Sequence, residues 1–132
     1  MKHVMLIEDN PADVFLMREA LSSAEVECEL TVIQDGQEAL NRIRSWGSEP
    51  LPDLVLLDLN LPTVGGMEIL KALRARTDLD VPVAVLTSSD APGEKEWISR
   101  LGVRHYIVKP MRLKEFMKIG ELIKEELHVA HA

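Results

Sequence analysis

Residues 54–62 read LVLLDLNLP, in which four consecutive apolar residues lead into Asp58. A continuous apolar run of this kind is typical of a strand buried on both faces, as in parallel sheets covered by helices. Further apolar runs occur at 4–7, 83–86 and 106–108. The run at 27–33 instead alternates between apolar and polar residues, which predicts a half-exposed edge strand.

Helical patterns lie between and after these strands. Turn and capping residues precede the first four helices, at Asn10-Pro11, Asp35-Gly36, Gly65-Gly66 and within 90–93. The last helix is expected to begin at about Arg112. Apolar residues then recur at three- and four-residue spacing, as on one face of an amphipathic helix. In the last helix, the packed side is expected to include Leu113, Phe116 and Gly120.

Strand and helix therefore alternate five times, which predicts an α/β fold with a parallel sheet between two helical layers. Right-handed crossovers, together with an edge strand in second place, favour the strand order 2-1-3-4-5. The expected architecture is a doubly wound, flavodoxin-like (βα)5 fold.

The composition is that of an ordinary globular domain, with 132 residues of which 46% are hydrophobic and 28% charged. We expect residues 1–132 to form one domain without an output domain. The net charge of -7 works against binding to nucleic acid or to an anionic membrane. The only cysteine, Cys28, excludes an internal disulfide, and the N-terminal apolar run is too short for a signal peptide. A cytoplasmic protein is expected.

Reactive side chains follow four of the predicted strands: Glu8 and Asp9, then Asp58, then Thr87, then Lys109. Ligands of doubly wound sheets bind beyond the carboxyl ends of the strands, so these groups should share one crevice. Clustered carboxylates repel one another unless a hard divalent cation such as Mg²⁺, or Mn²⁺, lies between them. With a metal and Lys109 to neutralise a phosphoryl group, Asp58 is expected to be the nucleophile that becomes an aspartyl phosphate.

The motifs IEDN at 7–10, LVLLDLNLP at 54–62, Gly65-Gly66, VLTSS at 85–89 and YIVKP at 106–110 occur in this order. In this set the chain resembles the response-regulator receiver domains of bacterial two-component signalling. The resemblance implies that a sensor histidine kinase phosphorylates Asp58. It also implies that Asp9, Asp58 and the backbone carbonyl of Asn60 bind Mg²⁺, with Glu8 acting largely through water.

The same resemblance assigns roles to residues of the later strands. Lys109 is expected to bind the phosphoryl group, and its peptide bond to the following proline is expected to be cis. Thr87 and Tyr106 are expected to be a switch pair that reorients on phosphorylation. The side chains of Asn60 and Ser89 are expected to tune the access of hydrolytic water.

Two segments are similar to the single-domain receivers associated with bacterial phytochromes. They are EDNPAD at 8–13 and the Trp-Gly loop at 45–52. The partners implied are a phytochrome-type histidine kinase and a downstream protein. A homodimer would form through the fourth helix, fifth strand and fifth helix.

Other functions fit parts of the pattern. An aspartate-nucleophile phosphatase wants a second acid two residues after the nucleophile, where this chain has Asn60. A flavodoxin-like electron carrier would need a phosphate-binding loop in place of Glu8 and Asp9. A receiver-like binding module that is never phosphorylated stays open. We expect a signalling module rather than an enzyme, and we interpret Asp13 as a partner of the first helix dipole outside the site.

Overall fold

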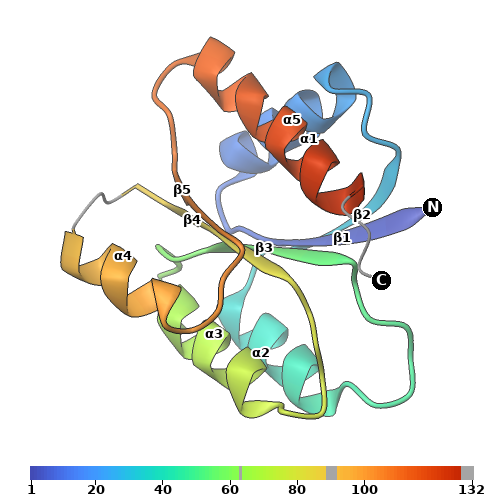
Figure 1. Cartoon of the computed structure of the whole chain (residues 1–132), viewed down its shortest axis with the longest axis vertical. Coiled ribbons are helices and arrows are strands. Elements are labelled where there is room, and N and C mark those ends of the chain that lie inside the picture. The colour runs from blue at the N-terminus through green and yellow to red at the C-terminus, as the bar shows by residue number, and fades with distance from the viewer. Residues whose placement is uncertain (63, 89–91, 129–132) are drawn as a thin grey trace.

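In the computed structural model, which describes residues 1–62, 64–88 and 92–128, the strands form one parallel sheet (Figure 1). The strands are β1 (Lys2–Ile7), β2 (Cys28–Ile33), β3 (Leu54–Asp58), β4 (Val83–Thr87) and β5 (His105–Val108). Their order is β2-β1-β3-β4-β5, so the predicted topology is confirmed. The alternating segment β2 is an edge strand, also as predicted.

Helices cover both faces of the sheet (Figure 1). The helices α1 (Pro11–Ser23) and α5 (Leu113–His128) pack on one face, and α2 (Gly36–Ser45), α3 (Gly66–Ala75) and α4 (Pro92–Ser99) pack on the other. Within the described part of the chain, every helix is too short or too polar to cross a lipid bilayer.

The central strands contribute side chains to two separate cores because successive residues of a strand point to opposite faces. Met5, Ile7 and Leu57 lie in the core beneath α2, α3 and α4. Leu6 and Leu56 lie in the core beneath α1 and α5. The sheet is thus apolar on both sides, which explains the continuous apolar runs.

The helix starts agree with the sequence signals. The side chain of Asn10 accepts a hydrogen bond of 2.9 Å from Ala12 N at the start of α1, and Asp35 caps α2 in the same way. Helix α4 begins at Pro92, while Asp90 and Ala91 lie outside the described residues.

Leu113 corrects one expectation about the last helix, because it is 61% exposed rather than packed. It is the first residue of α5, and the buried face begins at Phe116. Gly120 then lies so close to the backbone of Ala20 in α1 that a Cβ there would collide with the Ala20 carbonyl. The absence of a side chain at Gly120 therefore sets the close approach of α1 and α5.

Candidate functional site

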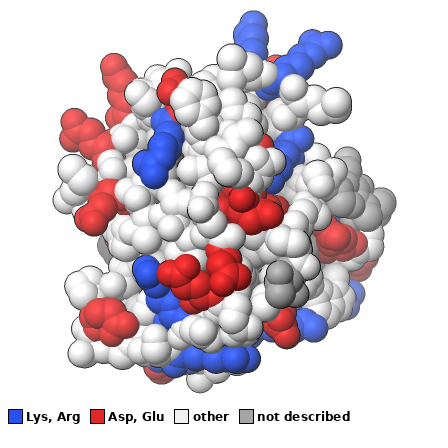
Figure 2. Space-filling view, turned by 180° about the vertical axis from the view of Figure 1, so that it is seen from behind, with Lys and Arg blue, Asp and Glu red and all other residues white. Residues whose placement is uncertain are grey.

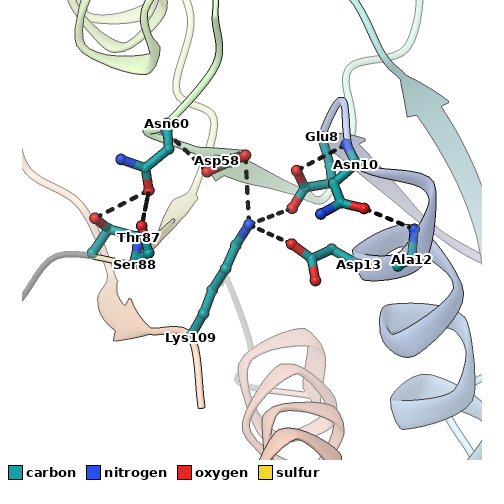
Figure 3. Close-up of polar contacts among 9 residues, drawn as sticks. All are labelled: Glu8, Asn10, Ala12, Asp13, Asp58, Asn60, Thr87, Ser88 and Lys109. Atoms are coloured by element: carbon teal, nitrogen blue, oxygen red, sulfur yellow. Dashed lines mark hydrogen bonds and ion pairs between the residues drawn. The ribbon is translucent and has the colours of Figure 1, made fainter. Parts of the chain in front are cut away.

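The carboxyl ends of the strands bring the predicted site residues to one edge of the sheet (Figure 3). Glu8 follows β1, Asp58 ends β3, Thr87 ends β4 and Lys109 follows β5. The pairing of Ile7 with Leu57 aligns β1 with β3 at this edge. Parallel register thus joins groups that are far apart in the sequence.

An acidic cluster lies between β1 and β3. Glu8, Asp9 and Asp58 each offer a carboxylate oxygen, and these oxygens all lie within 4.8 Å of one another. Glu8 is 1% exposed and Asp58 is 2% exposed, whereas Asp9 is more accessible. A set made only of oxygen donors at this spacing fits a hard divalent cation, which neutralises carboxylates that would otherwise repel.

Lys109 reaches into this cluster from β5. Its Nζ lies 2.8 Å from Glu8 Oε1, 2.8 Å from Asp13 Oδ2 and 3.5 Å from Asp58 Oδ2. Burial of the ammonium disfavours its charge, but hydrogen bonds to Asp13 and Glu8 outweigh that effect and raise the pKa of Lys109. The ammonium is therefore charged throughout the physiological pH range.

Asp13 corrects another expectation, because it belongs to the site rather than serving only the helix dipole. Since α1 begins at Pro11, directly after the loop that follows β1, its first turn projects Asp13 toward Lys109 (Figure 3). The only sequence signal that could have placed Asp13 in the site was its position in the first turn of the predicted helix. Sequence spacing alone did not reveal that Lys109 would come within reach.

The surroundings of Glu8 raise the pKa of its carboxyl group strongly. Burial, followed by the neighbouring Asp58 carboxylate, raises its pKa from 4.5 to about 8, although Lys109 acts in the opposite direction. Without a bound cation, the raised pKa makes the Glu8 carboxylate easier to protonate, and a bound cation would oppose that protonation.

Backbone contacts hold Asp58 in place. Its Oδ1 accepts a hydrogen bond of 2.9 Å from Asn60 N, and the following residue is tied to β4 because Leu59 N donates to Leu86 O at 2.8 Å. At the start of α3, a Cβ on Gly66 would lie only 2.5 Å from Asp58 O. Gly66 therefore lets α3 begin directly against the end of β3.

The side chain of Asn60 points to the end of β4 (Figure 3). Its Oδ1 accepts hydrogen bonds from Ser88 N at 2.9 Å and from Ser88 Oγ at 3.1 Å, and lies 3.5 Å from Thr87 Oγ1. The contact with Ser88 was not foreseen from the sequence. Ser89, predicted to tune hydrolysis, lies outside the described residues.

Thr87 and Tyr106, the predicted switch pair, both contact the carboxylate of Glu94 in α4. Thr87 Oγ1 donates to Glu94 Oε1 at 3.3 Å, and Tyr106 Oη donates to the same oxygen at 3.1 Å. Sequence reasoning missed Glu94, because it belongs to no motif and lies in a weakly patterned helix.

The peptide bond between Lys109 and Pro110 is trans, so the expectation of a cis bond is wrong. Lys109 N donates to Thr87 O at 2.7 Å, which continues the strand pairing one residue beyond the end of β5. The lysine side chain contacts the acidic cluster with this bond trans, the form that most X-Pro bonds adopt.

Residues 4–121 match the family model of the response regulator receiver domain. This chain belongs to the response regulator receiver family. Receivers are the phosphorylatable partners of histidine kinases in two-component signalling, and this receiver has the fold and strand-end acids predicted from the sequence.

The receiver is similar to known response regulators. It is 35% identical to the response regulator Rcp1 of Synechocystis over 127 residues, a match that spans 93% of this chain and 86% of Rcp1. It is 36% identical to the phosphorylated cyanobacterial phytochrome response regulator RcpA, with a TM-score of 0.86 and coverage of 98% and 96%. The Mn²⁺-bound form of Rcp1 is similarly close, with 33% identity, a TM-score of 0.86 and coverage of 98% and 97%.

Proposed function

We propose that this receiver is a phospho-switch in which Asp58 accepts a phosphoryl group from a sensor histidine kinase. One observation carries the proposal: the buried Asp58 carboxylate shares a 4.8 Å cluster with Glu8 and Asp9 and lies 3.5 Å from the Lys109 ammonium. A divalent cation held by this acidic cluster, together with the Lys109 ammonium, would neutralise the attacking carboxylate and the incoming phosphoryl oxygens.

In the transfer, a carboxylate oxygen of Asp58 forms a bond to phosphorus. The bond between phosphorus and the nitrogen of the kinase's phosphohistidine breaks, and that nitrogen keeps the electron pair. Lys109 holds one phosphoryl oxygen through a charge-assisted hydrogen bond, and the Thr87 hydroxyl donates to another. The N–H of Asn60 keeps the Asp58 carboxylate oriented, as its 2.9 Å hydrogen bond suggests.

The proposed cofactor is Mg²⁺, with Mn²⁺ as a substitute, held by Asp9, Asp58 and the backbone carbonyl of Asn60. Glu8 acts largely through water. A bound ion supplies positive charge beside the phosphoryl oxygens. The all-oxygen cluster supports this site, as does the similarity to Rcp1, which has been crystallised in a Mn²⁺-bound form.

The proposed kinase is of the phytochrome type, because RcpA is described as a phytochrome response regulator. We further propose that the chain acts in the cytoplasm, and that neither nucleic acid nor membrane is a partner. The net charge of -7 supports the last point. Acidic and basic side chains are also interspersed on the face seen in Figure 2.

Incubation with acetyl phosphate and Mg²⁺, followed by intact-mass analysis, tests the phosphorylation. The wild-type protein should gain the mass of one phosphoryl group, and the gain should be lost in acid as well as in base, as for an acyl phosphate. Asp58→Asn should gain none, and neither should the wild type with EDTA in place of Mg²⁺. An unmodified wild-type protein would favour the binding module that is never phosphorylated.

We propose that α4, β5 and α5 form the surface that passes the signal on. A second copy of the chain, forming a homodimer, and a downstream protein bind there. Trp97 of α4 is 43% exposed and Val108 of β5 is 38% exposed, which supports an interaction surface there. Sedimentation with beryllofluoride should give a larger mass than sedimentation without it. Trp97→Ala should weaken this association, whereas Phe15→Ala, a control on α1, should leave it unchanged. Identical masses with and without beryllofluoride would contradict the dimer.

The phosphatase alternative has less support. Asn60 stands where that class places its second acid, and its amide oxygen already accepts hydrogen bonds from Ser88. The role of Asn60 and Ser89 in tuning hydrolysis remains part of our proposal. Replacing Asn60 with another polar residue should change the rate of dephosphorylation.

A further inference from the structure

Glu94 joins the phosphorylation site to the fifth strand. Its Oε1 accepts hydrogen bonds from Thr87 at the end of β4 and from Tyr106 in β5, at 3.3 Å and 3.1 Å. The two donors belong to neighbouring strands, whose pairing places Val85 beside Tyr106. A single carboxylate oxygen of α4 thus connects one residue of the site with one residue of the proposed output surface.

A hydroxyl carries one proton, so Thr87 can donate one strong hydrogen bond at a time. In the unphosphorylated protein, Glu94 Oε1 at 3.3 Å and Asn60 Oδ1 at 3.5 Å compete for that proton. A phosphoryl oxygen on Asp58 would be a further acceptor. Any stabilisation of the Thr87–Glu94 contact therefore opposes the donation of Thr87 to the phosphoryl group.

Movement of Glu94 would affect the surface of α4 directly. The next residue, Lys95, has its ammonium 6.0 Å from the centroid of the Tyr106 ring. Trp97, three residues after Glu94, is 43% exposed. The centroid of its ring lies 4.8 Å from the ammonium of Lys71 in α3. Helix α4 thus carries groups that contact both its neighbours, with Lys95 near β5 and Trp97 near α3.

We propose that Glu94 is a positioning residue that holds Thr87 and Tyr106 in their unphosphorylated arrangement and is released when Thr87 turns to the phosphoryl group. The inference rests on the proposed phosphorylation of Asp58. Its consequence is a coupling of the site to Tyr106 that runs through one carboxylate.

Calorimetric titration with beryllofluoride in the presence of Mg²⁺ measures the competition. Glu94→Ala should bind beryllofluoride about tenfold more tightly than the wild type, which is the effect of losing one competing hydrogen bond. Glu94→Gln keeps an acceptor oxygen without the charge and should fall between the two. The matched control is Glu96→Ala, because Glu96 is an exposed acid of the same helix that pairs with Arg100. It should bind as the wild type does.

Tyr106 is the only tyrosine, so 3-fluorotyrosine labelling gives one fluorine resonance that reports on its environment. In the wild type, beryllofluoride should shift this resonance. In Glu94→Ala, the resonance should already differ before addition, and the further shift on binding should be less than half that of the wild type. If Glu94→Ala changed only the overall stability of the protein, the fluorine resonance would not show this pattern.

A double-mutant cycle with Thr87→Val isolates the contact. If Glu94 acts through the Thr87 hydroxyl, Glu94→Ala should have no effect on beryllofluoride affinity once that hydroxyl is gone. An affinity and a tyrosine shift of wild-type size in Glu94→Ala would overturn this inference alone. A wild type that fails to bind beryllofluoride at all would overturn the proposed function, and the inference with it.

Discussion

At the scale of single residues, the site consists of carboxylates arranged around the ammonium of one lysine. Lys109 lies within hydrogen-bond distance of two carboxylates, Glu8 and Asp13, and farther from a third, Asp58. The phosphoryl group must therefore draw the ammonium away from partners that already hold it. Asp13 is the partner that the metal cluster does not include, so it can be changed without removing one of the proposed metal ligands.

Asp13→Asn should release Lys109 from a charged partner and favour its contact with a phosphoryl group. We expect beryllofluoride to bind about fivefold more tightly, which corresponds to about 1 kcal/mol. Titration calorimetry measures the change. Glu19→Gln, which removes a charge from an exposed position of the same helix, should have little effect. Weaker binding by Asp13→Asn would mean that Asp13 positions Lys109 rather than competing for it.

At the scale of helices and strands, glycine determines how closely two elements approach. Gly66 lets α3 begin against the backbone of Asp58, and Gly120 lets α5 lie on the backbone of α1 at Ala20. Both contacts involve backbone atoms, which cannot move aside as the end of a side chain can. The helices therefore have little freedom to adapt to a larger residue at either position.

Gly120→Ala should destabilise the protein even though alanine favours the helical state. The new Cβ would force α1 and α5 apart, and overpacking of this kind costs about 1–3 kcal/mol. Urea unfolding followed by circular dichroism measures the loss. Gly93→Ala is the matched control, since a Cβ at Gly93 of α4 meets no atom within 4 Å. Equal free energies of unfolding for Gly120→Ala and Gly93→Ala would show that α1 and α5 can move apart at little energetic cost.

At the scale of the whole molecule, the acidic cluster links folding stability to pH. The pKa of Glu8 is about 8 in the folded protein and 4.5 in the absence of structure, so the folded state holds this proton more tightly. The resulting stability is complete below the unfolded pKa and is lost as pH rises through the folded pKa. Burial of an unneutralised acid thus makes the metal-free protein less stable in mild base.

Chemical unfolding of the metal-free protein should therefore show stability falling by about 2 kcal/mol between about pH 5 and pH 8. Glu8→Gln should flatten this slope, because it removes the titrating group. Mg²⁺ should stabilise the wild type more at the upper end of this range, where it no longer competes with the proton of Glu8. If the fall in stability with pH were unchanged in Glu8→Gln, another titrating group would be its cause.

The order of strands and helices, and the side chains at the strand ends, could be predicted from the amino-acid sequence without the fold. Continuous apolar runs and caps such as Asn10 are local signals, and a parallel sheet brings the ends of its strands to one edge whatever the details of packing. These facts were enough to predict the cluster of Glu8, Asp9 and Asp58, with Lys109 beside it.

The contacts between side chains of different elements became visible only in the folded protein, because no local sequence signal connects those elements. Asp13 contacts Lys109 and Glu94 contacts both Thr87 and Tyr106 because helices α1 and α4 pack at particular rotations against the sheet. The trans bond before Pro110 and the exposure of Leu113 likewise depend on how β5 and α5 are placed. Helix rotation and loop path follow from the packing of the entire core, so a short stretch of sequence does not specify them.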